Sequence, residues 1–202
     1  MNQQLPSDEE LIPRLLARDE TAYAQAVSAY HGLMVHLARA IVGPAIADEV
    51  AQEAWLAVIR ALPHFERRAS LKTWILRIVS NTAKTRLRHE SRTVNLEDAP
   101  GGQAGTDPSR FNASGHWARP PAVWHADTPD DLLASQELRA CIDASLDTLP
   151  PMQRAALTLR DMQGLDMESI CKVLDVSESN GRVLLHRARN RVQAAIDEFY
   201  QR

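Results

Sequence analysis

Basic side chains gather in two stretches of this sequence, and their types and spacing suit contact with a polyanion. Residues 60–92 hold nine Lys or Arg and two Glu, although the 202-residue chain carries a formal net charge of −3. A second stretch, 182–191, contains four arginines and no acidic residue. Because an acidic stretch over 93–140 separates the two, we expect two local basic surfaces and exclude a chain that coats polyanions along its whole length.

The first basic stretch has the spacing of one helix face. Arg77, Asn81, Lys84 and Arg88 follow one another at intervals of four, three and four. An amide such as that of Asn81 can read a base edge, and the surrounding cations can hold phosphates. Trp74 lies on the same predicted helix, and we expect it to be a buried core side chain rather than a platform for stacked bases.

The second basic stretch follows a pattern typical of a helix-turn-helix. Asp166 can cap a short helix on which Ile170 and Leu174 face inward, and Asp175 can occupy the left-handed turn. Ser177 can then cap a second, basic helix. A short helix, a tight turn and a basic second helix are the parts that enter a DNA major groove.

The side chains on that second helix fall into two groups according to their position along the helix. Those near its N-terminal end are candidates for base edges: Ser179, Arg182, Val183 and His186. Arg187, Arg189 and Arg191 lie further along, so we expect phosphate contacts from them. Gly181 stands where an apolar side chain usually packs, and Val183 and Leu184 are the candidates to replace that packing.

Apolar residues recur at helical spacing through most of the chain, which predicts an all-α protein. The predicted helices cover 21–42, 48–62, 70–92, 130–149, 151–163, 167–174 and 178–199. Between them, 93–129 is rich in Gly and Pro and has no sustained periodicity, which is typical of a flexible linker. The sequence therefore predicts two small helical domains, 1–92 and 130–202, joined by the linker 93–129.

The helix predicted over 48–60 has an unusual outer face. Its apolar stripe, expected to face the core, is Val50, Ala51, Ala54, Trp55 and Val58. The opposite face is polar except for Leu56, and an apolar side chain in such a setting suits a partner surface.

Three motifs together resemble the bacterial sigma factors, and the small extracytoplasmic-function group fits best. They are Asp48-Glu49-Val50-Ala51-Gln52-Glu53-Ala54-Trp55; Ser70-Leu71-Lys72-Thr73-Trp74-Ile75-Leu76-Arg77-Ile78 with Asn81; and Leu149-Pro150-Pro151-Met152-Gln153-Arg154 through His186-Arg187-Ala188-Arg189. The resemblance covers nearly everything outside the linker, and it implies a protein that directs RNA polymerase to −35/−10 promoters.

The resemblance also implies a role for each surface. Core polymerase, through the clamp helices of its largest subunit, would bind Asp48, Glu49, Gln52, Glu53, Leu56 and Arg60. Unpaired bases of the −10 element would contact Arg67, Arg68, Lys72, Arg77, Asn81, Lys84 and Arg88. The −35 duplex would contact Ser177, Ser179, Arg182, Val183, His186, Arg187 and Arg189. The family commonly pairs with an anti-sigma protein, so such a partner is a further expectation.

Two other classes of function compete with this interpretation. A stand-alone helix-turn-helix regulator would use the same DNA-binding helices but would leave the 48–60 helix without a role. An enzyme is not expected, because the sequence has no Gly-rich phosphate loop and no nucleophile–base arrangement, and Glu49 and Glu53 have no evident partners.

No cofactor and no metal site are expected, since His116, His125 and Cys141 have poor ligand spacing. The segment 110–126 is oddly aromatic for a linker, which leaves open that it docks on a surface of the protein or of the polymerase. The opening residues do not form a signal peptide, and no apolar run reaches the roughly 20 residues of a membrane span. We therefore expect a cytoplasmic protein without membrane insertion.

Overall fold

The structure, a computed structural model, describes residues 6–93 and 129–201, with side chains described at 6–89 and 136–201. All secondary structure in these ranges is helical, as predicted. The longer helices are α2 (Glu20–Val42), α3 (Ala47–Ala61), α4 (Leu71–Thr93), α5 (Pro129–Asp147) and α8 (Glu178–Tyr200). The shorter ones are α1 (Asp8–Leu16), η1 (Leu62–His64), α6 (Pro151–Leu157), the π-helical turn η3 (Thr158–Met162) and α7 (Met167–Leu174).

Helix ends follow the local chemistry that the sequence indicates. Gly43, at a φ of 83°, ends α2, and Gly164, at a φ of 69°, follows the π-helical turn. These dihedrals lie in the left-handed region, which glycine enters without a steric penalty. The Ser70 hydroxyl accepts a hydrogen bond from the Thr73 amide at 3.1 Å, so it caps the start of α4 as expected.

Helix α1 was not among the predicted helices, although the sequence carries a signal for it. Ser7 and Glu10 form a capping box, in which each side chain bonds the backbone N–H of the other residue. The Asp8 carboxylate then accepts a hydrogen bond from the Leu71 amide at 2.7 Å, which ties the start of α1 to the first turn of α4. Burial raises the pKa of the nearby Tyr30 hydroxyl to about 12, and the charge of Asp8 acts in the same direction.

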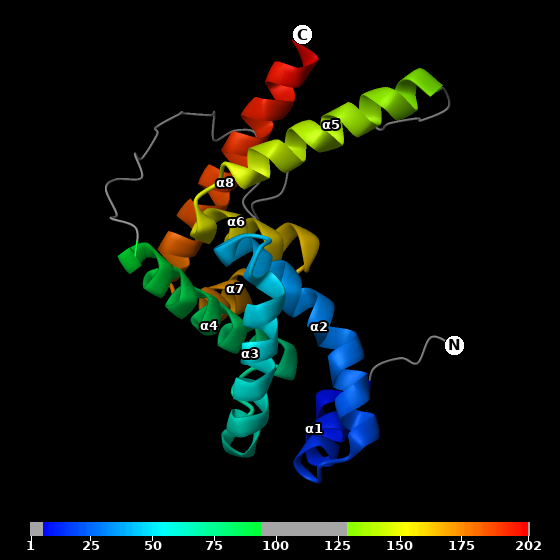
Figure 1. The fold of residues 1–202 in the computed structure, drawn as a ribbon, viewed down its shortest axis with the longest axis vertical. Coiled ribbons are helices and arrows are strands. Elements are labelled where there is room, and N and C mark those ends of the chain that lie inside the picture. Colours follow the sequence, from blue (N-terminus) through cyan, green and yellow to red (C-terminus); the bar gives the residue numbers. More distant parts are fainter. Residues whose placement is uncertain (1–5, 94–128, 202) are drawn as a thin grey trace.

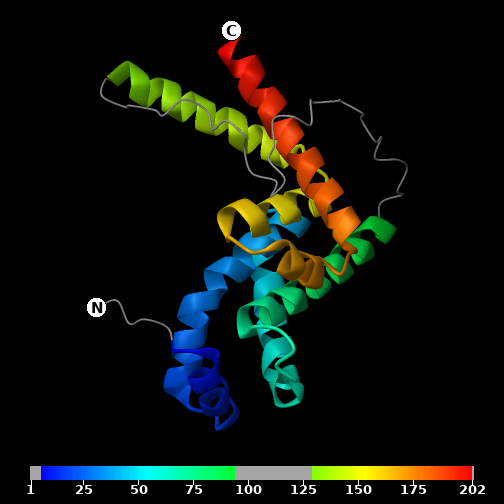
Figure 2. The ribbon, with the colours of Figure 1, turned by 180° about the vertical axis from the view of Figure 1, so that it is seen from behind.

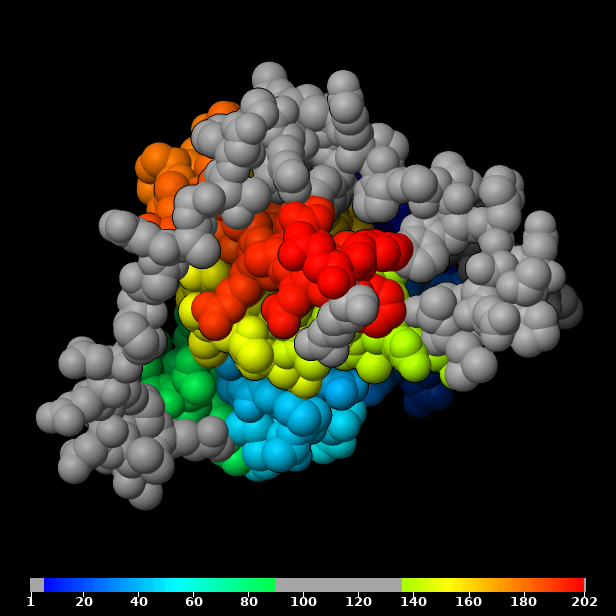
Figure 3. All heavy atoms as spheres, turned by 90° about the horizontal axis from the view of Figure 1, so that it is seen from above, coloured from blue at the N-terminus to red at the C-terminus, as the bar shows by residue number. Residues whose placement is uncertain are grey.

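The two helical units lie against each other. Helices α2, α3 and α4 pack side by side in the N-terminal half, and α6 and α7 sit on them, with α6 against α2 and α7 against α4 (Figure 1). Helices α5 and α8 pack together and extend away from the N-terminal half, as the reverse view also shows (Figure 2). Seen from above, the red end of α8 lies over the yellow C-terminal part of α5 (Figure 3).

Apolar packing continues across the junction between the halves. One cluster of buried side chains includes Leu37 and Val79 from the N-terminal half and Leu159 and Leu174 from the C-terminal half. The side-chain amide of Gln163 also donates a hydrogen bond, through Nε2, to the Leu33 carbonyl at 3.1 Å. The sequence predicted two units but gave no indication that they share a core.

The expectations about the segment 110–126 and about a metal site concern residues that the structure describes only in part. The segment 110–126 and the histidines His116 and His125 lie outside them, and Cys141 is half-buried on α5 with its thiol 3.5 Å from the Ala195 carbonyl. Among the helices described, none combines the length and the apolar character needed to cross a membrane.

Candidate nucleic-acid interface

Helix α3 presents the exposed face that its sequence pattern predicts. The inward stripe is buried apart from Trp55, which is half-buried and donates a hydrogen bond to Nδ1 of His31 at 3.3 Å. The outward residues are all exposed: Asp48, Glu49, Gln52, Glu53, Leu56 and Arg60. Leu56 is 55% exposed, and Ile59, which the sequence pattern did not indicate, is 46% exposed one turn further on. We call these seven residues the α3 face.

Two carboxylates of the α3 face have a partner that the sequence did not reveal. Arg86 of α4 donates to Glu49 at 2.6 Å and to Glu53 at 3.3 Å. The expectation that these carboxylates lack partners was therefore wrong, because helix packing brings together residues more than thirty positions apart. The two ion pairs hold α3 and α4 in a fixed relation.

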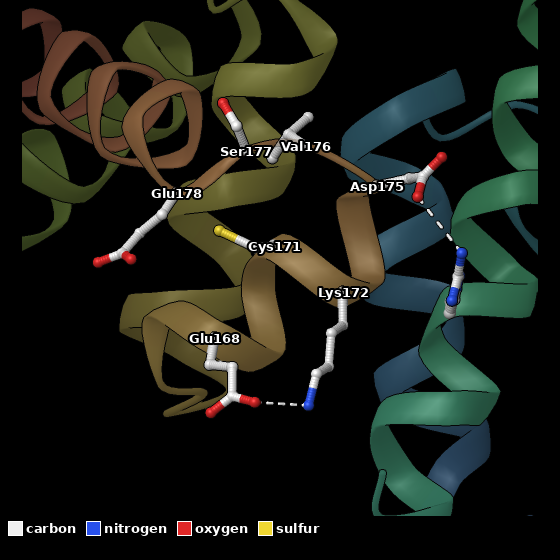
Figure 4. Close-up of a pocket in the computed structure, with 8 residues that line it drawn as sticks. Glu168, Cys171, Lys172, Asp175, Val176, Ser177 and Glu178 are labelled. Atoms are coloured by element: carbon white, nitrogen blue, oxygen red, sulfur yellow. Dashed lines mark hydrogen bonds and ion pairs between the residues drawn. The ribbon is translucent and has the colours of Figure 1, made fainter. Parts of the chain in front are cut away.

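The basic face of α4, which comprises Lys72, Arg77, Asn81, Lys84 and Arg88, is divided between solvent and the C-terminal half. Asn81 and Arg88 are exposed. Lys72 Nζ donates to the Gln163 carbonyl at 3.1 Å, and Lys84 Nζ donates to the Leu174 carbonyl. Arg77 Nη2 lies 3.3 Å from Oδ1 of Asp175, as the dashed line from Asp175 shows (Figure 4).

Burial changes the chemistry of the two lysines on this face. Desolvation lowers the pKa of Lys72 below its usual value of 10.5. Desolvation also lowers the pKa of Lys84, and the nearby charge of Asp175 opposes that shift. Both shifts follow from the packing of the C-terminal half over α4.

A cavity of about 380 Å³ lies beside the start of α4, lined by Phe65, Arg68, Trp74, Arg77 and Lys172 among others. The Phe65 and Trp74 rings contact each other with centroids 4.7 Å apart and planes inclined by 33°. Trp74 packs on the core as expected, but it is half-buried rather than buried, and its remaining surface borders this opening.

The loop before α4 carries two further candidates. Arg67 is exposed and has a φ of 57°. Arg68 is also exposed and pairs with Glu66 at 2.6 Å. Both residues follow Phe65 closely in the sequence and reach solvent, and Arg68 also lines the cavity beside Phe65 and Trp74.

The helix-turn-helix forms as predicted. The Asp166 carboxylate accepts from the Ser169 amide at 2.8 Å, and this bond is the main cause that lowers the pKa of Asp166. Asp175 adopts the left-handed conformation, with φ and ψ both 54°. Ser177 then caps α8 by accepting from the Asn180 amide at 3.3 Å.

Helix α8 exposes most of the residues that the sequence assigned to DNA. All of them but Arg189 are exposed: Ser177 at the cap, and Ser179, Arg182, Val183, His186 and Arg187 along the helix. Arg182 pairs with Glu178 one turn earlier at 2.5 Å. We call these six residues together with Arg191 the α8 face.

Arg189 was wrongly assigned to phosphate contact. Its side chain is only 4% exposed, and its guanidinium binds Asp161 through two hydrogen bonds of 2.5 and 3.1 Å. The α8 periodicity turns this arginine inward, where the carboxylate of the π-helical turn neutralises it. Arg189 therefore connects α8 to the rest of its unit.

Close packing of α7 against α8 explains why position 181 holds a glycine. A Cβ at this position would lie 3.0 Å from Cys171 Sγ and 3.3 Å from Met167 Sδ, so α7 approaches α8 where a side chain would stand. The expected replacement by Val183 was wrong, since Val183 is 44% exposed, whereas Leu184 does pack against the core.

Comparison with known families gives two matches in sequence order. The family described as Sigma-70 region 2 matches residues 26–93, and the family described as Sigma-70, region 4 matches residues 139–192. The ECF RNA polymerase sigma-E factor of Escherichia coli (strain K12) is 29% identical over 202 residues, which is the full length of both chains. The factor of the same description from Haemophilus influenzae is 28% identical over 94% of this chain and 95% of its own length.

Solved structures share the fold at lower identity. CnrH in complex with the cytosolic domain of CnrY aligns with a TM-score of 0.58 at 17% identity, and covers 96% of this chain and 99% of its own. The sigma factor RpoE in complex with the anti-sigma factor NepR from Bartonella quintana aligns with a TM-score of 0.57 at 18% identity, over 87% and 96%.

Proposed function

Since this chain belongs to the extracytoplasmic-function group of the sigma-70 family, we propose how its surfaces divide the work of a promoter-specificity factor. The protein directs RNA polymerase to start transcription at specific promoters. The observation that carries this conclusion is that both sigma regions occur in one chain, in order, with full-length similarity to sigma-E factors. We assign the −10 function to residues 1–92, the connection to 93–129 and the −35 function to 130–202.

We assign core polymerase binding to the α3 face. Leu56 and Ile59 supply exposed apolar area, which is the component that drives most protein association. Asp48, Gln52 and Arg60 surround this pair with polar groups. The arrangement has the apolar centre and polar rim of a protein-binding surface, and we expect the clamp helices of the polymerase largest subunit to cover it.

We assign the melted −10 strand to the basic face of α4, together with Arg67 and Arg68. Cations hold the backbone of a single strand, and an extruded base gains stacking and hydrogen bonds that offset its unstacking cost of a few kcal/mol. The cavity beside Phe65 and Trp74 supports this role, because it joins an aromatic wall to Arg68 and Arg77.

We assign the −35 duplex to the α8 face. Arg182, Val183 and His186 project from the first turns of α8, which is the part of a recognition helix that reaches base edges. Arg187 and Arg191 lie further along and suit phosphates. Arg189 is excluded from this set because Asp161 occupies its guanidinium.

Two further properties are inferred from the family. We propose that the protein catalyses no reaction of its own and that it acts in the cytoplasm, where it meets polymerase. Two solved relatives are described in complex with an anti-sigma protein or with a cytosolic domain of another protein. We therefore propose a protein partner of the anti-sigma class for this chain as well.

Run-off transcription tests the function. Purified bacterial core polymerase is incubated with a library of genomic fragments, with and without the protein. We expect protein-dependent transcripts with aligned start sites, which also give the −35 and −10 sequences. If the protein binds DNA but does not bind core polymerase, it is a stand-alone helix-turn-helix regulator and the proposal fails.

Substitution of Leu56 tests the α3 face. We expect Leu56→Ala to weaken core binding about tenfold, the loss typical of a central apolar contact. Leu16→Ala is the matched control, since Leu16 is 47% exposed at the end of α1. Equal affinities of the two variants for core polymerase would remove Leu56 from the interface.

A further inference from the structure

The basic face of α4 is covered by acceptors from the helix-turn-helix unit. Three cations each meet one oxygen: Lys72 meets the Gln163 carbonyl, Arg77 meets the Asp175 carboxylate, and Lys84 meets the Leu174 carbonyl. The three oxygens come from the end of the π-helical turn, the left-handed turn residue and the last residue of α7. None of these cations is therefore fully available to a bound strand.

The three acceptors have the same sign of charge as a nucleic-acid backbone, although only one of them is fully ionised. Leu174 ends α7, where helix carbonyls without intrahelical partners bear partial negative charge, and Asp175 adds a full negative charge directly after it. Figure 4 shows Asp175 leaving the end of α7 toward α4. A short row of negative groups thus lies along a row of cations, as phosphates would.

The contact also reaches the cavity beside Phe65 and Trp74. Lys172 of α7 lines that cavity together with Arg68 and Arg77. A single strand placed over the α4 cations, with a base in this cavity, would occupy the space that α7 fills. Strand binding and this packing of the two halves exclude each other.

We propose that the end of α7 acts as an internal mimic of the DNA backbone, which keeps the −10 surface closed until the C-terminal half moves away. This inference rests on the proposed role of α4. The polymerase, which must hold the two halves apart to place them on separate promoter elements, is the partner that opens the contact. The −35 residues on α8 stay exposed in the closed form, so the device acts on the −10 surface alone.

Lysine footprinting tests the closed contact without DNA. The chain contains three lysines, Lys72, Lys84 and Lys172. Lys72 and Lys84 donate across the contact, whereas Lys172 lies at its edge, donates to Glu168 on its own helix and serves as internal reference. With an amine-acetylating reagent and mass spectrometry, we expect Lys72 and Lys84 of the free protein to react several times more slowly than Lys172. Equal rates at the three lysines would overturn the proposal.

Asp175→Asn tests the competition with DNA. Asparagine also tolerates the left-handed conformation, so the turn is kept while the charge facing Arg77 is lost. We expect faster Lys84 acetylation and a two- to fivefold higher affinity for a fluorescein-labelled single strand of mixed sequence, the range that an exposed ion pair supports. Asp143→Asn, an exposed carboxylate on α5, is the control for the change in net charge, and it should leave both readouts unchanged.

A double-mutant cycle separates this mechanism from a general charge effect. In an Arg77→Gln background the gain from Asp175→Asn should shrink, because the ion-pair partner of Asp175 is absent and only its charge near Lys84 remains. An equal gain in both backgrounds, or an equal gain in Asp143→Asn, would contradict backbone mimicry. Run-off transcription is read separately from these outcomes. Failed footprinting with successful run-off removes the closed contact alone. Successful footprinting with failed run-off keeps the contact between the halves but removes the promoter function, and with it the role of the contact as a mimic of DNA.

Discussion

Gly181→Ala is the substitution whose effect the structure defines most sharply. In a helix interior, glycine costs about 1 kcal/mol relative to alanine, so the change alone should raise the free energy of unfolding by that amount. The added Cβ would, however, lie 3.0 Å from Cys171 Sγ and 3.3 Å from Met167 Sδ. Forcing a methyl group into such a space typically costs about 1–3 kcal/mol. We therefore expect Gly181→Ala to lower the free energy of unfolding by about 1 kcal/mol.

Removal of the sulfur should reverse the sign. In a Cys171→Ala background the nearest atom is absent, and the methionine side chain is long enough to move its own sulfur aside. Gly181→Ala should then raise the free energy of unfolding by about 1 kcal/mol, so that the two substitutions are coupled by about 2 kcal/mol. Gly32→Ala in α2 is the matched control, since a Cβ there meets no atom within 4 Å and should give the full gain in helix propensity.

Urea unfolding followed by far-UV circular dichroism measures the native chain, Gly181→Ala, Cys171→Ala, the double variant and the Gly32→Ala control. A change in the midpoint at constant slope reports stability, and the first four values complete the cycle. If Gly181→Ala has the same effect with and without Cys171, within about 0.5 kcal/mol, then close packing of α7 on α8 does not explain the glycine. A gain for Gly181→Ala equal to that for Gly32→Ala would refute the reasoning in the same way.

Three further predictions follow from the C-terminal half. Asp166→Ala should cost about 1 kcal/mol and Asp166→Asn much less, because only alanine loses the cap on the Ser169 amide. Hydrogen bonds lower the pKa of Asp166 below 3.8 in the folded chain. The loss in free energy of unfolding caused by Asp166→Ala should therefore be complete at pH 7 and should become smaller as the pH falls through the folded pKa. Urea midpoints at several pH values check both statements. Arg189→Ala should lower the free energy of unfolding by about 1–3 kcal/mol, because it leaves Asp161 without its partner. Arg187 is exposed, so Arg187→Ala should change the free energy of unfolding by less than about 0.5 kcal/mol; thermal unfolding measures both variants. Burial raises the pKa of the Cys171 thiol, so at pH 8 its thiolate fraction is reduced, and iodoacetamide should modify it more slowly in the folded chain than in urea.

The sequence predicted those features that depend on neighbours along the chain. The seven helices, the cap at Asp166 and the left-handed turn at Asp175 all follow from residue types within one or two turns of each other. Helix α1 was missed although the Ser7–Glu10 capping box is just as local, because Pro13 lies inside it and the helix is short. Recognition of the family likewise needed only local motifs.

Features that depend on tertiary placement could not be predicted in the same way. Arg189 and Arg187 are both arginines on one helix, and only the position of Asp161 makes one a buried partner and leaves the other exposed. The pairing of Arg86 with two glutamates of α3 and the exposure of Ile59 depend on how α3 and α4 pack. Periodicity gives the face of a helix but does not reveal what lies opposite that face.

Asp175 shows where local and tertiary requirements meet. Glycine would adopt a φ of 54° with less strain, so backbone geometry alone favours glycine over aspartate at this turn. The carboxylate contributes nothing to the turn itself, since the hydrogen bond that closes the turn runs from the Asp175 amide to the Cys171 carbonyl. What the side chain does contact is Arg77 of α4, 98 residues earlier in the chain. The contact between the halves therefore gives this carboxylate a partner that the turn does not provide, and the charge at this position links the two units rather than parts of the helix-turn-helix that contains it.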